Sequence, residues 1–70
     1  MTPADAVLAV LTEAEGPLHW TVILDRALRS ERLDPFTTPD VRGQVQAAVR
    51  VLAAEGRIAK ISTGVYAMPA

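Results

Sequence analysis

The spacing of hydrophobic residues divides the chain into three helical segments and a hairpin. The stretch from Thr37 to Glu55 has the clearest pattern, because its apolar residues recur at the spacing of one helix face. This segment predicts the helix around which the rest of the chain is organised. Its expected buried positions are Val41, Val45, Ala48, Val49 and Leu52.

The residues at both ends of this segment are typical of helix ends. We expect the Thr38 hydroxyl to cap the N-terminus, with Pro39 in the first helical position. Asp40 is then expected in the first turn, where a carboxylate meets the positive end of the helix dipole. Gly56 is expected to end the helix, since glycine enters the left-handed conformation without a Cβ clash.

Two earlier segments have the same periodicity. Thr2-Pro3 is predicted to open a helix that ends near Gly16-Pro17, and Trp20–Glu31 is predicted as a second helix. Between them Leu18-His19 is a short extended link that could pair as a minimal strand. The expected inner positions of the two helices are Ala4, Val7, Leu8, Leu11 and Ala14, and Trp20, Ile23, Leu24, Ala27 and Leu28.

The last part of the chain changes to the pattern of β-strands. Residues 57–61 alternate polar and apolar side chains, and residues 65–68 form the expected returning strand. Gly64 closes the turn between them, where a left-handed residue is often required. In the loop before the third helix, Leu33 and Phe36 are expected to fold back over the core.

Together these elements predict a mainly α fold with a small β-hairpin, an α+β winged helix. It would have three helices and a C-terminal wing hairpin in a single domain over residues 1–70. A winged helix is a variant of the helix-turn-helix, in which the second helix of the motif enters the major groove of DNA. In this chain that recognition helix would be the third one.

Composition and charge narrow the possible classes only partly. The net charge is −1, yet residues 1–40 hold seven acids and three arginines, a net of −4, and residues 41–61 hold four cations and one acid, a net of +3. This asymmetry indicates either a side that faces a polyanion or chance. The chain has no cysteine, which excludes disulfides and thiolate chemistry. The apolar run at residues 6–11 is too short to span a bilayer, so we expect no membrane association and a cytoplasmic protein, nucleoid-associated if bacterial.

The candidate site is the polar face of the third helix. Arg42, Gln46 and Arg50 lie one turn apart, and arginine and glutamine are side chains that read guanine and adenine edges. The alternative is an ordinary solvated helix face. Thr38 and the free N–H groups at the helix start could hold a phosphate, although Asp40 beside them argues against a nearby phosphate.

Two further cations stand in the predicted wing. Arg57 and Lys60 could contact phosphates, or they could protect the edge strand against aggregation. Trp20 and Tyr66 either stack on bases or pack in the core and wing.

Signals of catalysis are missing from the sequence. There is no phosphate loop and no nucleophile elbow. His19 is the only histidine, and it is expected to pack or to form a hydrogen bond after the Gly-Pro turn rather than to bind zinc. We therefore expect no enzyme activity, no metal and no cofactor.

Several short motifs occur in an order that resembles one known family. They are Gly16-Pro17-Leu18-His19-Trp20, Ile23, Ala27-Leu28, Thr38-Pro39 and Gly64-Val65-Tyr66. Their order and spacing over about residues 4–68 are similar to the HARE-HTH family of winged helices. The wing turn departs from a phosphate-gripping wing, because Ser62-Thr63 carries no positive charge.

The resemblance implies an adaptor linked to nucleic acid, because HARE-HTH domains occur in transcription and chromatin proteins and fused to restriction enzymes. The leading prediction is a non-catalytic DNA-binding or DNA-targeting module that binds duplex DNA weakly alone. The alternative is a protein-protein interaction adaptor in a transcription, chromatin or restriction-type assembly, with a protein partner or a fused enzymatic domain. The oligomeric state stays open.

Overall fold

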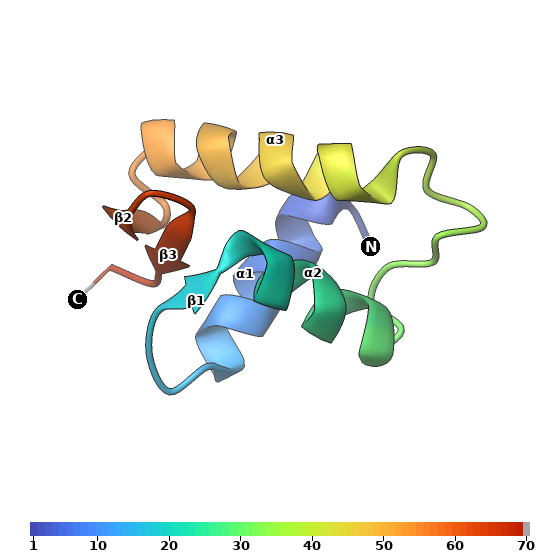
Figure 1. Ribbon diagram of the computed structural model, residues 1–70, viewed down its shortest axis with the longest axis horizontal. Helices are drawn as coiled ribbons and strands as arrows, with labels where there is room; N and C mark the ends of the chain where they lie inside the picture. Colours follow the sequence, from blue (N-terminus) through green and yellow to red (C-terminus); the bar gives the residue numbers. More distant parts are fainter. Residues whose placement is uncertain (70) are drawn as a thin grey trace.

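Three helices and a three-stranded antiparallel sheet form a winged-helix layout, which confirms the predicted fold class. The computed structural model describes residues 1–69; residue 70, the last of the predicted domain, lies outside the described residues. Helix α3 lies across α1 and α2, and the hairpin lies at its C-terminal end (Figure 1). The elements are α1 (Pro3–Glu13), β1 (Leu18–His19), α2 (Trp20–Arg29), α3 (Val41–Ala54), β2 (Ala59–Ser62) and β3 (Val65–Ala67).

The sheet joins the short strand β1, between α1 and α2, to the last strand of the chain. Its order is β1-β3-β2, and Leu18 pairs with Tyr66 in register, so the predicted minimal strand is present. Directly after β1, the Trp20 backbone N–H donates to the Gly64 carbonyl over 2.8 Å. The wing turn is therefore fastened to the start of α2.

The hairpin differs from the prediction in where its strands begin and end. β2 starts at Ala59 rather than Arg57, and β3 ends at Ala67 rather than Met68. Lys60 pairs with Tyr66 but Ser62 pairs with Val65, so Ile61 is the extra residue of a bulge. Its side chain is 55% exposed, because a bulge re-aims the residues around it.

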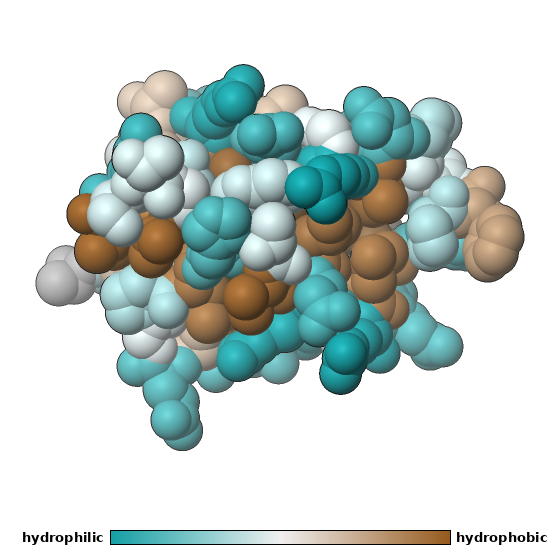
Figure 2. Space-filling model, in the orientation of Figure 1, coloured by the Kyte–Doolittle hydropathy of each residue, from teal (hydrophilic) through white to brown (hydrophobic). Residues whose placement is uncertain are grey.

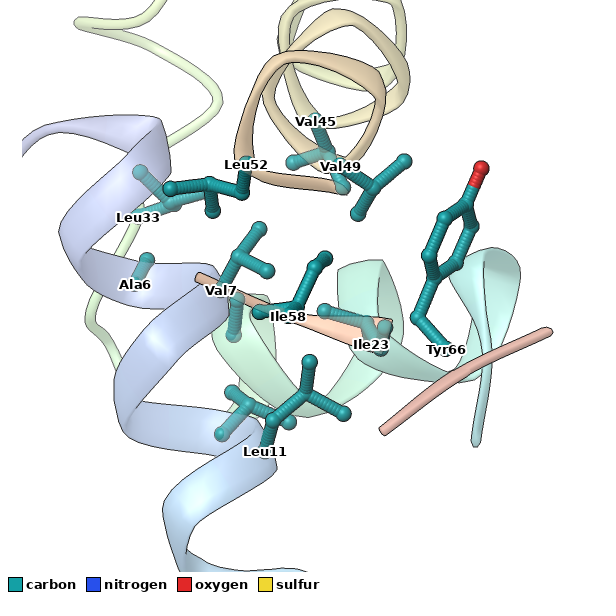
Figure 3. Close-up of a cluster of buried hydrophobic side chains, with 12 residues drawn as sticks. Ala6, Val7, Leu11, Ile23, Leu33, Val45, Val49, Leu52, Ile58 and Tyr66 are labelled. Atoms are coloured by element: carbon teal, nitrogen blue, oxygen red, sulfur yellow. The ribbon is translucent and has the colours of Figure 1, made fainter. Parts of the chain in front are cut away.

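The core lies between the three helices and the sheet, and its central side chains point toward one another (Figure 3). The predicted inner face of α3 is confirmed, since Val45, Val49 and Leu52 are at most 1% exposed. The side chains with the greatest buried volume are Ile23, Leu52, Val7, Val45 and Val49.

The buried face of α1 is wider than predicted. Val7 and Leu11 are buried as predicted, and Ala6 and Val10 are buried in addition. Of the other predicted positions, Ala4 and Leu8 pack half-buried against the core, and Ala14 is half-buried. The reason is that α1 packs against both α2 and α3, so two neighbouring faces are covered. For α2 the prediction holds, with Ile23 and Ala27 buried and the other three predicted positions half-buried.

The start of α3 was predicted wrongly. The cap is Asp40, whose carboxylate accepts a hydrogen bond from the Gly43 N–H over 3.3 Å, and the helix begins at Val41. Thr38 lies before the helix, where its N–H donates to the Asp34 carbonyl. Gly43 leaves room for this cap, because a Cβ there would collide with the Asp40 carboxylate.

The loop between α2 and α3 also departs from expectation. α2 ends at Arg29 rather than Glu31, because Glu31 is left-handed with φ of 60°. Leu33 is buried as predicted, but Phe36 is 95% exposed and covers nothing. Its N–H is bonded to the Asp34 carboxylate over 2.8 Å, which holds it in a turn directed away from the core. No helix within residues 1–69 has the length and apolar character needed to cross a membrane.

Candidate nucleic-acid interface

The polar face of α3 lies beside the hairpin. Arg42 and Arg50 are exposed and Gln46 is half-buried, and all three avoid the core side of the helix. Gln46 and Arg50 line a hollow of about 190 Å³ between α3 and the wing. On the face seen in Figure 2, apolar side chains reach the surface between α3 and α2 and at the hairpin, with hydrophilic side chains around them.

Arg42 is held in place by a residue of another helix. Its guanidinium carbon lies 4.8 Å from the centre of the Trp20 ring, a distance at which the ring attracts the cation with about 0.5–1 kcal/mol in exposed sites. Trp20 is the first residue of α2. The contact restricts the Arg42 side chain before any ligand binds, so less side-chain entropy is lost on binding.

His19 fixes the start of α2 and thereby the position of Trp20. Its Nδ1 accepts a hydrogen bond from the Thr21 N–H over 3.2 Å, so the imidazole caps the helix. This confirms the expected hydrogen-bonding role. Among residues 1–69 no three side chains of the metal-binding types lie close enough together to hold an ion.

The hollow joins residues from α2, α3 and the wing. Its walls include cations from two elements, an amide, a hydroxyl and two aromatic rings. The residues that supply them are Arg50 and Lys60, Gln46, Thr63, and Trp20 and Tyr66. Tyr66 is only 6% exposed and belongs to the core, so its packing role is confirmed.

The structure separates Arg57 from the other predicted contacts. Arg57 lies on the opposite side of α3, in a groove that it shares with Val51 and Glu55. Its guanidinium is 4.0 Å from the Glu55 carboxylate. Lys60, three residues later, lies on the hollow side, so the wing supplies one cation to this surface and not two.

Thr38 is also apart from the helix start. Because Asp40 caps α3, the Gly43 N–H is already bonded to a carboxylate. The expected phosphate site at Thr38 and the helix start therefore lacks its predicted geometry. A negative charge stands there instead, two residues from Arg42.

The ion pairs leave the hollow side positively charged. Arg29 pairs with Asp25, Arg32 with Glu13 and Arg57 with Glu55. Within residues 1–69, the cationic side chains without such a pair are Arg26, Arg42, Arg50 and Lys60. Three of these four are on α3 and the neighbouring strand, so positive charge is concentrated here although the net charge is −1.

The sequence prediction gave Thr63 no part in this surface and left Trp20 between two roles. Trp20 was weighed between base stacking and packing, and its place under Arg42 depends on how α2 and α3 pack. The Gly64 turn and the residues after Pro17 are both among the motifs quoted from the sequence. The structure brings these two segments together, because the Trp20 N–H is bonded to the Gly64 carbonyl.

A scan against models of protein families gives no match, and searches of curated proteins and of solved structures find no similar protein. The resemblance to the HARE-HTH family therefore stays a prediction.

Proposed function

We propose that this chain is a non-catalytic DNA-binding module with α3 as its recognition helix. The observation that carries the proposal is a set of three cations without an ion pair: Arg50 and Lys60 line the hollow, and Arg42 lies over the ring of Trp20, which also lines it. Arg42 would face base edges in the major groove, where arginine pairs with guanine. Gln46, in the wall of the hollow, would contact the backbone beside them. Lys60 would meet the phosphate backbone beside the groove.

The charge of the whole chain limits the affinity of such a module. With a net charge of −1, we expect dissociation constants near the nonspecific range of about 10⁻⁴–10⁻⁶ M at physiological salt. A linked domain or a second copy would raise the effective affinity, because a second contact made through a tether is intramolecular. This fits the adaptor role that the HARE-HTH resemblance implies.

The test is a double charge reversal on the recognition face. Arg42→Glu with Arg50→Glu should abolish binding to a labelled duplex in fluorescence anisotropy, since two base or phosphate contacts are worth about 2–6 kcal/mol. Single variants at Arg42 or Arg50 that still bind should each lower the slope of log affinity against log salt by about one, for one lost phosphate contact. Both side chains point away from the core, so the circular dichroism spectrum should be unchanged.

A matched control carries the same charge change elsewhere. Arg26→Glu with Arg57→Glu adds equal negative charge on exposed sites outside the hollow. It should weaken binding far less than the first pair. Equal losses of affinity in the two pairs would mean that only net charge matters. The proposal is rejected if the unaltered chain binds no duplex, single strand or RNA at low salt.

A second candidate function is docking of a protein partner. The observation in its favour is an apolar groove of about 450 Å³ between the start of α1 and the outer side of α3. Val51 in this groove is 55% exposed beside Ala47 and Ala48. Salt distinguishes the two functions, because DNA binding falls steeply with salt while an apolar contact responds little.

A further inference from the structure

We propose that the hollow between α3 and the wing is a binding site for a single phosphate group. The proposal rests on the proposed function, because it names the part of a nucleic acid that this surface would hold. Arg50 from α3 and Lys60 from β2 both line the hollow. A phosphate seated between two cations gains charge-assisted hydrogen bonds, which are shorter and stronger than neutral ones.

The uncharged groups of the hollow complete the fit. The Thr63 hydroxyl and the Gln46 amide stand in the same wall, and both are able to donate to phosphate oxygens. None of the residues of the described chain that line the hollow is acidic. Glu55, the acid nearest to the end of α3, lines the groove on the other side of the helix.

The size of the hollow is compatible with one small anion. Its volume of about 190 Å³ has room for a phosphate group together with water. Arg42 does not line the hollow but lies over the Trp20 ring, so it is left to contact base edges.

The turn of the wing carries no charge, and the position of Lys60 explains how the wing could still hold nucleic acid. Ser62 and Thr63 provide no cation, but Lys60 stands in the strand before them and faces the hollow. The turn is fixed by the 2.8 Å hydrogen bond from the Trp20 N–H to the Gly64 carbonyl. The wall of the site is therefore formed in advance by the fold.

Two variants of equal charge test the site. Lys60→Gln and Arg57→Gln each remove one positive charge from the segment after α3, but only Lys60 lines the hollow. At low salt Lys60→Gln should weaken duplex binding about tenfold, as expected for a lost hydrogen bond to a charged group, and lower the salt slope by about one. Arg57→Gln should weaken binding by less than about twofold, as a rim charge does. Equal effects of the two variants overturn the proposal.

Trp20 supplies a second measurement, which inorganic phosphate can give without any DNA. It is the only tryptophan of the chain and it lines the hollow, so its fluorescence should change when the site fills. Inorganic phosphate, a 5′-phosphorylated duplex and an unphosphorylated duplex are titrated separately. A backbone phosphate as ligand predicts equal signals from both duplexes; a terminal phosphate predicts a signal from the phosphorylated duplex and from inorganic phosphate only.

The outcomes separate this site from the proposed function. If no duplex binds but inorganic phosphate gives a saturable signal that Lys60→Gln removes, the phosphate site stands and the DNA-binding function fails. If duplex binds through Arg42 while Lys60→Gln leaves both affinity and fluorescence unchanged, the function stands and the site fails. The melting temperature of each variant is measured first, and Arg50→Gln serves as a second variant if Lys60→Gln does not fold.

Discussion

Gly64→Ala tests the joint between the wing and the start of α2. Gly64 has φ of 75°, which a residue with a side chain rarely adopts. A Cβ there would lie 2.8 Å from His19 Nε2 and 3.3 Å from Trp20 Cδ1. The substitution therefore adds backbone strain and pushes against the imidazole that caps α2.

The two costs can be estimated separately. Left-handed backbone costs a residue other than glycine about 1 kcal/mol or somewhat more, and loss of a helix cap costs about 1 kcal/mol. We expect Gly64→Ala to lower the free energy of unfolding by about 2–3 kcal/mol, and the melting temperature by about 10–20 °C for a domain of this size. Gly64→Val should cost more, because a β-branched side chain fits this conformation less well.

Two other glycines separate strain from collision. Gly56 has φ of 76° but open space around it, so Gly56→Ala should show the strain alone, about 1 kcal/mol. Gly16 has neither a left-handed φ nor a neighbour within 4 Å of an added Cβ. Gly16→Ala should therefore change the free energy of unfolding by less than about 0.5 kcal/mol. Urea and thermal unfolding followed by circular dichroism give all three values.

The relative losses of unfolding free energy in the three variants show whether the collision with His19 contributes. If Gly64→Ala costs no more than Gly56→Ala, the His19 ring moves aside freely and the collision is irrelevant. If Gly64→Ala behaves like Gly16→Ala, the wing turn does not have the conformation described above.

Three further substitutions have definite expected results. Leu52→Asp places an unpaired charge at a position 1% exposed and should unfold the chain, since its cost of about 4 kcal/mol or more approaches a total stability of about 5; a normal melting temperature would contradict the core assignment. Asp40→Asn keeps the cap, because asparagine caps as well as aspartate and tolerates left-handed backbone. The free energy of unfolding should change by less than about 0.5 kcal/mol, while the affinity for DNA rises because a negative charge is removed. An unchanged affinity in anisotropy would place the start of α3 away from phosphate. Phe36→Ser, at a position 95% exposed, should leave the melting temperature nearly unchanged, and a large drop would show that Phe36 packs on the core after all.

Hydrophobic periodicity predicts the elements of this fold but not all of their ends. The start of α3 was misplaced because the sequence offers two residues of the type that caps helices, Thr38 and Asp40. Either could accept a hydrogen bond from the backbone N–H three residues later. The left-handed backbone of Asp40, with φ of 47°, decides between them and depends on the loop before it. Gly43 was the available signal, because only glycine leaves space for the Asp40 carboxylate.

The candidate surface was predictable only as far as a single helix determines it. Arg42, Gln46 and Arg50 follow from helical spacing, and the structure places them on the outer side of α3. The division of Arg57 and Lys60 between two sides of α3 depends on where β2 begins and how it packs, which local sequence does not specify. Phe36 was misjudged because hydrophobicity alone does not show that its loop is bonded into an outward turn.

The order of strands has a consequence for how the chain is made. β1 and β2 do not pair with each other, and both are bonded to β3, the last strand in the sequence. A ribosome-bound chain that has released α3 but not β3 already carries Arg42 and Arg50, yet the Trp20 N–H has no Gly64 carbonyl to meet. The hollow therefore comes into existence only when residues 63–67 emerge. A nascent or truncated chain that lacks them would present the charges of α3 without Thr63 and without the strand partner that positions Lys60.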